Sequence, residues 1–223
     1  MKQLFFITGT DTGAGKTVLT ALLAAFLRQR GVRVAALKPV CSGGRDDAVA
    51  LRDALGGALT LDEINPWHFR AAIAPALAAR RERRPVRLTP VLAHIRAVRK
   101  EFDVTLVEGA GGLLSPLGDD FDSRDLLAAL RAIPIIVAAS RLGAVNQVLL
   151  TLEALPKSRR PAAGVVLMEP GKRDAATAAN AELLAKFLPA GRLVAMPWLG
   201  PAFSTNNALK RPRVRSALAR LAG

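Results

Sequence analysis

The chain has 223 residues, of which 51% are hydrophobic, and its formal net charge is +14. This length is enough for one substantial hydrophobic core, so we predict a single domain over residues 1–223. No apolar run approaches the roughly 18 residues of a membrane span, and the short apolar run after Lys2 does not resemble a signal peptide. The single cysteine, Cys41, excludes an intrachain disulfide, and we therefore expect a cytoplasmic protein.

The positive charge does not by itself predict nucleic-acid binding. The basic residues are 24 arginines and 8 lysines, scattered along many segments, and aromatic residues make up only 4% with no tyrosine. Aromatic platforms for base stacking are therefore scarce. The densest cluster, residues 80–84, precedes Pro85 at an expected helix end, where cations interact favourably with the helix dipole. We expect a solvated basic surface and no nucleic-acid partner.

Residues 3–17 predict a strand, a phosphate-binding loop and the start of a helix. The apolar run 4–7 breaks at Gly9 into a glycine-rich loop that Lys16 and Thr17 close. Glycines let backbone N–H groups surround phosphate oxygens, the lysine reaches the β- and γ-phosphates, and the threonine hydroxyl can bind Mg²⁺. The nucleotide-binding positions expected in this loop are Gly13, Ala14, Gly15, Lys16 and Thr17.

The loop departs from the common phosphate-loop pattern. Five residues separate Gly9 from Gly15, where the common pattern has four, and Thr10 stands at the usual first-glycine position. Asp11 occupies the place at which partition-type ATPases carry a second lysine. The spacing therefore predicts a variant phosphate loop.

The rest of the chain alternates apolar strands with helices. Further strands are expected at 32–37, 104–107, 133–139, 164–168 and 193–196. Helices are expected at 18–27, 46–55, 76–83, 89–100 (capped by Thr89), up to 130 (capped by Asp122-Ser123), 143–155 and 174–188, with a short basic helix after 204 and a loop at 65–75. Continuous apolar strands alternating with helices predict an α/β fold with one doubly wound, mostly parallel sheet and helices on both faces.

Polar residues follow several of these strands, and in parallel sheets ligands bind at that edge. Lys38 closes the second strand and would be a second cation near the phosphates. Glu108 ends an apolar strand, where a carboxylate is costly unless a cation lies opposite. Together with Thr17, the carboxylates of Asp47 and Glu108 are the expected Mg²⁺ ligands, and Asp46 remains an alternative to Asp47.

The two histidines, His68 and His94, have no ligand or triad partner at useful spacing, so we interpret both as structural. Cys41 lies in the loop after Lys38 without a histidine nearby. We therefore interpret it as a small packed side chain and not as a nucleophile.

Several segments together resemble the dethiobiotin synthetases. These are GTDTGAGKT (9–17), KPVCSG (38–43), NPWHF (65–69), VEGAGG (107–112), RLGAVNQ (141–147) and MPWL (196–199). They extend over nearly the whole chain and occur in the order of that family. Such a combination is far more specific than a phosphate loop alone.

The resemblance implies ATP- and Mg²⁺-dependent carboxylation of diaminopelargonate (7,8-diaminononanoate) by CO₂, or bicarbonate as its source. The expected products are dethiobiotin, ADP and phosphate, formed through a carbamate and a carbamic-phosphoric anhydride in the penultimate step of biotin synthesis. It further implies that Lys16 and Lys38 act on the transferring charge, while Thr12 and Ser42 orient carbamate and diamine. The other positions that it assigns are Ser42, Gly111, Gly143 and Asn146 for substrate, and Asp47, Glu108, Gly109, Ala110, Gly111 and Pro197 for nucleotide. It also implies a homodimer in which the partner's residues 143–146 face the substrate carboxylate.

The chain departs from the family pattern at a few positions. The family's adenine-reading asparagine falls on Met168, a glutamate of the loop is Gly13, and a lysine before Leu-Gly is Arg141. These changes leave the chemistry alone but alter the expected contacts to the base and the substrate.

Three other classes compete with this interpretation. A partition-type ATPase would make the basic charge functional, but Asp11 replaces its signature lysine. Related ATP-dependent amidation enzymes normally add a glutaminase domain, for which this chain has no room. A nucleotide-binding regulatory module would not explain why Lys38, Ser42 and Glu108 occur together.

Overall fold

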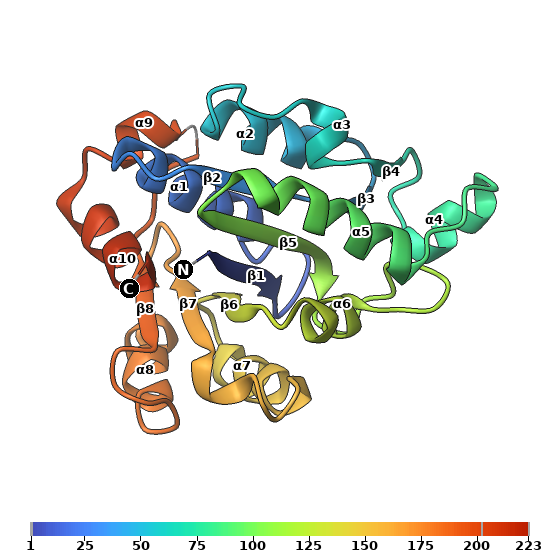
Figure 1. Ribbon diagram of the computed structural model, residues 1–223. Coiled ribbons are helices and arrows are strands. Elements are labelled where there is room, and N and C mark those ends of the chain that lie inside the picture. Colours follow the sequence, from blue (N-terminus) through green and yellow to red (C-terminus); the bar gives the residue numbers. More distant parts are fainter. Residues whose placement is uncertain (1, 202, 223) are drawn as a thin grey trace.

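A six-stranded parallel sheet forms the centre of the computed structural model, which describes residues 2–201 and 203–222 (Figure 1). The strand order is β2-β5-β1-β6-β7-β8, and every pairing is parallel. The strands are β1 (Gln3–Gly9), β2 (Val34–Leu37), β5 (Val104–Gly112), β6 (Ile133–Ala139), β7 (Gly164–Met168) and β8 (Leu193–Met196). The α/β fold with a doubly wound parallel sheet is confirmed.

Helices cover both faces of the sheet (Figure 1). One face carries α1 (Lys16–Gln29), with α2 (Asp46–Ala54), α9 (Thr205–Ala208) and α10 (Pro212–Ala222) packed against it. The other face carries α5 (Leu88–Val98), α6 (Ser123–Leu130), α7 (Ala144–Ala154) and α8 (Ala175–Leu184). Shorter segments are α3 (Leu61–Ile64), α4 (Pro75–Arg81) and the 3₁₀ turns η1 (Arg99–Glu101) and η2 (Arg160–Ala162). In the described part of the chain, no helix combines the length and apolarity needed to cross a membrane.

The central strand β1 is apolar on both faces because both are covered. Phe6 and Ile7 point to opposite faces and are both fully buried. Leu22 and Phe26 of α1 are buried against the same core. Burial of such side chains stabilises the fold by about 1.5–3 kcal/mol each, which fixes the loop that follows β1.

A second, two-stranded sheet corrects the loop expected at residues 65–75. β3 (Val40–Ser42) pairs in parallel with β4 (Trp67–Phe69), with Val40 opposite Trp67 and Ser42 opposite Phe69. Three-residue strands are too short to show a period of two in the sequence. Their pairing nevertheless joins the segment after Lys38 to the segment that precedes α4.

Other element boundaries also differ from the expectations. Thr89 was wrong as a cap, because α5 begins at Leu88, whose N–H donates to the Asp120 carboxylate at 3.1 Å. β2 begins at Val34 and not at 32, since the Val32 N–H bonds to the Leu27 carbonyl at the end of α1. α8 ends at Leu184, four residues before the expected end, and β5 continues through the glycines to Gly112.

Candidate functional site

A cavity of about 760 Å³ opens at the carboxyl ends of the central strands. The predicted site residues among those that line it are Thr12, Gly13, Gly15, Lys16, Thr17, Lys38, Ser42, Asp47, Ala110 and Gly111. Its remaining wall comes from Val18, Cys41, Ser115, Pro116 and residues 72–75. The cavity therefore joins the phosphate loop, the segment after β2, the end of β5 and the segment before α4.

The phosphate loop turns directly from β1 into α1. Gly15 caps the helix with φ of +98°, a left-handed conformation that favours glycine. At Gly9, a Cβ would lie 2.8 Å from the Asp11 carbonyl, so the loop also needs glycine for close backbone packing. The loop thus brings the N-terminus of α1, with its unpaired N–H groups, to the cavity.

Lys16 lies along the loop with its ammonium 3.0 Å from the carbonyl oxygen of Asp11. It is only 6% exposed. Burial lowers the pKa of Lys16, and the nearby positive charge of Lys38 lowers it further. The cavity therefore holds two buried lysines whose charges repel each other unless anions are present.

Strand register brings Lys38 and Glu108 together. Leu37 of β2 lies beside Val107 of β5, so the next residue of each strand projects at the same edge. The Lys38 Nζ donates to Glu108 Oε1 at 2.7 Å and also pairs with the Asp47 carboxylate. Thr17 Oγ1 donates to the same Glu108 oxygen, again at 2.7 Å. Four predicted site residues from four segments therefore form one contact cluster.

The charges in this cluster stabilise one another. Burial alone disfavours the Lys38 ammonium, but the Glu108 and Asp47 carboxylates outweigh burial and raise the pKa of Lys38. Burial opposes ionisation of Asp47 as well, yet the charge and hydrogen bond of Lys38 lower its pKa. Lys38 is therefore a charged ammonium at neutral pH.

The cluster fits a hard divalent cation. Glu108 Oε2 is buried, and among the described residues no donor lies within hydrogen-bond distance of it. Two carboxylates and one hydroxyl are oxygen donors of the kind that Mg²⁺ prefers, and Mg²⁺ keeps waters in its other positions. Asp46, the alternative to Asp47, is exposed and is not among the lining residues, so the geometry favours Asp47.

The two residues predicted to bind substrate through hydroxyls, Ser42 and Thr12, both line the cavity. Ser42, at the end of β3, donates to the Ile73 carbonyl at 2.5 Å. Thr12 is exposed at the top of the loop, where its N–H donates to the Asp11 carboxylate. Gly111 has φ of +65°, and a Cβ there would lie 2.3 Å from Ser115 Oγ, so the backbone at this wall requires glycine.

Asn65 is a buried residue that sequence reasoning missed. It is 0% exposed, its Nδ2 donates to the Lys38 carbonyl at 2.6 Å, and its Oδ1 is 3.2 Å from the Cys41 thiol. It thereby fixes the backbone beneath Lys38. In the sequence, Asn65 is recognisable only as an asparagine before Pro66. That dipeptide is typical of exposed turns, so the sequence did not indicate that Asn65 is buried.

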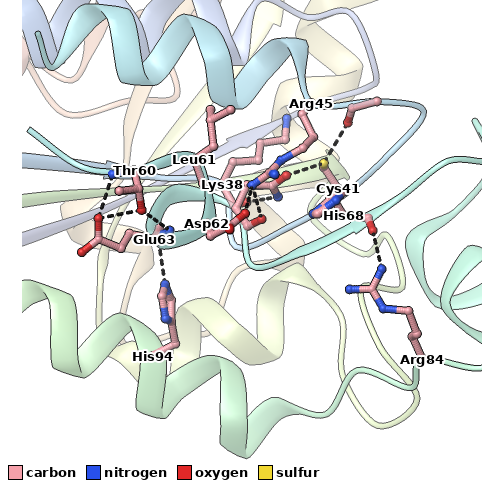
Figure 2. Close-up of polar contacts among 12 residues, drawn as sticks. Lys38, Cys41, Arg45, Thr60, Leu61, Asp62, Glu63, His68, Arg84 and His94 are labelled. Atoms are coloured by element: carbon pink, nitrogen blue, oxygen red, sulfur yellow. Dashed lines mark hydrogen bonds and ion pairs between the residues drawn. The ribbon is translucent and has the colours of Figure 1, made fainter. Parts of the chain in front are cut away.

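His94 and Cys41 have local partners for their side chains, whereas His68 bonds through its backbone and its buried Nδ1 has no partner among the described residues (Figure 2). His94 Nε2 is 2.7 Å from the Glu63 carbonyl, and the His68 carbonyl accepts from Arg84 at 3.2 Å. The Cys41 thiol donates to the Gly44 carbonyl at 3.1 Å, and burial raises its pKa. Neither histidine is among the residues that line the cavity.

Some predicted site residues lie outside the cavity wall. Ala14, Glu108, Gly109 and Pro197 are buried, with Pro197 directly after β8. Gly143 and Asn146 are exposed at the N-terminus of α7. Neither Gly143 nor Asn146 is among the residues that line the cavity.

The sequence and the fold resemble those of known proteins. An "AAA domain" family model matches residues 3–202. The chain is 41% identical over 198 residues to the ATP-dependent dethiobiotin synthetase BioD of Anaeromyxobacter dehalogenans, covering 86% of this chain and 89% of that protein. The BioD of Rhodococcus erythropolis is 42% identical over 187 residues, covering 81% of this chain and 82% of its own length. Among solved structures, a ParA family ATPase from Chlorobium tepidum shares the fold with a TM-score of 0.62 and 12% identity, covering 99% of this chain and 97% of its own.

Proposed function

Because this chain belongs to the family of ATP-dependent dethiobiotin synthetases, we propose that it closes the ureido ring of dethiobiotin from diaminopelargonate, CO₂ and ATP. ADP and phosphate are the other products, and the reaction is the penultimate step of biotin synthesis. The observation that carries the proposal is the Lys38–Glu108 ion pair, which shares one cavity with the phosphate loop. A phosphate loop alone serves many functions, but a second buried lysine facing it suits transfer to an anionic acceptor.

In the proposed reaction, one amine of diaminopelargonate attacks CO₂, loses a proton and becomes a carbamate. A carbamate oxygen then attacks the γ-phosphorus of ATP, the bond to the β-phosphate oxygen breaks, and ADP leaves. Finally, the second amine attacks the carbonyl carbon of the carbamic-phosphoric anhydride. The carbon–oxygen bond to phosphate breaks, phosphate leaves with its electron pair, the amine loses a proton, and the ring closes.

The residues of the cavity support these steps through charge and orientation. Both the carbamate and ATP are anions, so the ammonium groups of Lys16 and Lys38 offset their repulsion. Thr12 and Ser42 lie on the cavity wall, where their hydroxyls would orient carbamate and diamine. Backbone groups of residues 109–111 would contact both substrate and nucleotide.

We propose that Thr17, Asp47 and Glu108 hold Mg²⁺. Bound there, the ion supplies charge compensation for the phosphates of ATP. The base of the nucleotide would lie toward Met168 and Pro197. This is supported by the pairing of Met168 with Met196, the residue before Pro197, at the strand ends nearest Gly15.

The proposal includes a homodimer in which Gly143 and Asn146 of the partner subunit meet the substrate carboxylate. On this surface, Leu142 is 82% exposed and Leu150 is 63% exposed. Asn146 and Leu150 are four residues apart within α7, which places them on one face of the helix, and the exposed Leu142 lies just before the Gly143 N-cap. An apolar face beside a helix N-terminus is a suitable interface for a second copy of the chain.

The proposal also includes a cytoplasmic location, because the free thiol of Cys41 is compatible with a reducing compartment.

The direct test is product analysis. The protein is incubated with diaminopelargonate, bicarbonate, ATP and Mg²⁺, and dethiobiotin is sought by mass spectrometry, with ¹³C-bicarbonate to mark the new carbonyl. We expect one ¹³C atom in each dethiobiotin molecule and one ADP released for each ring closed. ATP hydrolysis without labelled dethiobiotin would reject the proposal.

A further inference from the structure

Lys38 neutralises the carboxylates to which we assign the metal. Its ammonium is 2.7 Å from Glu108 Oε1 and also pairs with Asp47. Lys38 is 4% exposed and Glu108 is 1% exposed, so water screens this pair only weakly. Lys16, the other buried ammonium, instead donates to the Asp11 carbonyl.

The cluster does not accommodate a contacting ammonium and a divalent cation together. Glu108 Oε1 already accepts hydrogen bonds from Lys38 and Thr17. Glu108 Oε2 has no hydrogen-bond partner among the described residues, but a cation bound there and to Asp47 would still lie within a few ångströms of the Lys38 charge, because Lys38 pairs with both carboxylates. Like charges at such distances repel strongly away from bulk water.

Hydrogen bonds hold the backbone of Lys38, whereas its side chain borders the open cavity. The Lys38 N–H donates to the Ile64 carbonyl at 3.0 Å, and its carbonyl accepts from Asn65 at 2.6 Å. Its side chain forms part of the wall of the same cavity as Ser42 and Thr12. A change of the Lys38 rotamer would therefore move the ammonium from the carboxylates toward the cavity without moving the backbone.

We propose that Lys38 and a divalent cation are alternative counterions of Asp47 and Glu108. In the ion-paired arrangement the lysine is held by the carboxylates. When the cation binds them, Lys38 is released toward the cavity and becomes available to an anion. The identity of that anion, the carbamate, rests on the proposed function, whereas the exchange of counterions does not.

The exchange is tested by Mn²⁺ binding without nucleotide, measured by electron paramagnetic resonance. The proteins compared are the wild type, Lys38→Met and Lys16→Met, the last of which removes the same charge from the same cavity without removing the ion pair. We expect Lys38→Met to bind Mn²⁺ at least about tenfold more tightly than wild type, and Lys16→Met to bind within about threefold, because contact repulsion exceeds repulsion at longer range. An equal increase in Mn²⁺ affinity in both variants, or no increase in Lys38→Met, would overturn the proposed exchange of counterions.

A second measurement on the wild type covers the case in which Lys38→Met does not fold. The ¹⁵N resonance of the Lys38 ammonium, identified by its loss in Lys38→Arg, is followed as Mg²⁺ is added without nucleotide. We expect the resonance to shift or broaden as the ion pair breaks, and a resonance that stays unchanged rejects the proposal. A protein that forms dethiobiotin while this resonance does not respond would reject the exchange and retain the proposed function.

Discussion

Met168 packs an apolar side chain against the phosphate loop. A Cβ on Gly15 would lie 3.0 Å from Met168 Cγ, so the thioether packs directly over the N-cap of α1. A thioether is only a weak acceptor and cannot donate, whereas an asparagine does both. In the proposed site, the phosphate loop, Lys38 and the carboxylates would contact only groups that every nucleoside triphosphate carries.

We therefore expect base selectivity to be weak. Apolar contacts usually discriminate by roughly 10–200-fold, so CTP or GTP should support turnover with kcat/KM less than about 10³-fold below that of ATP. The measurement is kcat/KM for ATP, GTP, CTP and UTP at equal Mg²⁺. Met168→Asn is the matched variant, and it should increase the preference for ATP. A wild-type preference above about 10³-fold would mean that another group reads adenine.

At the scale of elements, short capped helices hold the segments beneath the site. Thr60 caps α3, and the Glu63 carboxylate accepts from the Thr60 N–H at 2.7 Å and from its hydroxyl at 2.8 Å. These hydrogen bonds lower the pKa of Glu63. Because α3 leads directly into Asn65, this cap also supports the backbone of Lys38.

The cap should make stability depend on pH in a predictable direction. The pKa of Glu63 is lower in the folded state than in the unfolded state. The ionised carboxylate therefore contributes fully to the free energy of unfolding when the pH is above the unfolded-state pKa, and this contribution is lost as the pH falls through the folded-state pKa. We expect Glu63→Gln, which keeps an acceptor but does not titrate, to unfold with a smaller free energy than wild type at pH 7, by up to about 1 kcal/mol. The difference should shrink toward pH 3 in urea titrations. A constant difference across that range would contradict the assignment.

The elements also show what the sequence could and could not predict. β6, β7 and β8 were predicted with their observed bounds because they are continuous apolar runs. Asp122 and Ser123 were predicted together to cap α6, and Asp122 is the N-cap residue. The strand β4 was missed because its partner β3 lies 25 residues earlier and neither is long enough to show periodicity. Asn65 and Asp120 act through tertiary contacts that local patterns do not contain.

For the site, the sequence identified the residue types but not their pairing. Lys38, Asp47 and Glu108 were each predicted from their position after a strand or at a helix start. The contact of Lys38 with Glu108 depends on the register of β2 against β5, and its contact with Asp47 depends on where α2 begins. That register is set by packing of the whole sheet, which no single segment specifies.

At the scale of the whole molecule, the proposed dimer can be tested by substitutions on its expected interface. Leu150 is 63% exposed on α7 and Leu183 is 43% exposed on α8. We expect Leu150→Lys to weaken dimerisation and to raise KM for diaminopelargonate more than KM for ATP, because a buried unpaired charge disfavours the interface. Leu183→Lys is the matched control and should change neither property. A fully active monomer, found by light scattering of the wild type, would rule out the arrangement.

The position of β1 at the centre of the sheet affects how the chain acquires its structure during synthesis. Phe5 pairs with Leu106 on one side and Ile133 on the other, so the neighbours of β1 are translated about 100 and about 130 residues after it. At roughly 5–20 residues per second, the apolar segment LFFIT waits about 5–20 s for its first partner and about 6–26 s for its second. During that interval it is an unpaired strand of the kind that associates with other chains, so a chaperone that covers nascent apolar segments should increase the yield of folded protein.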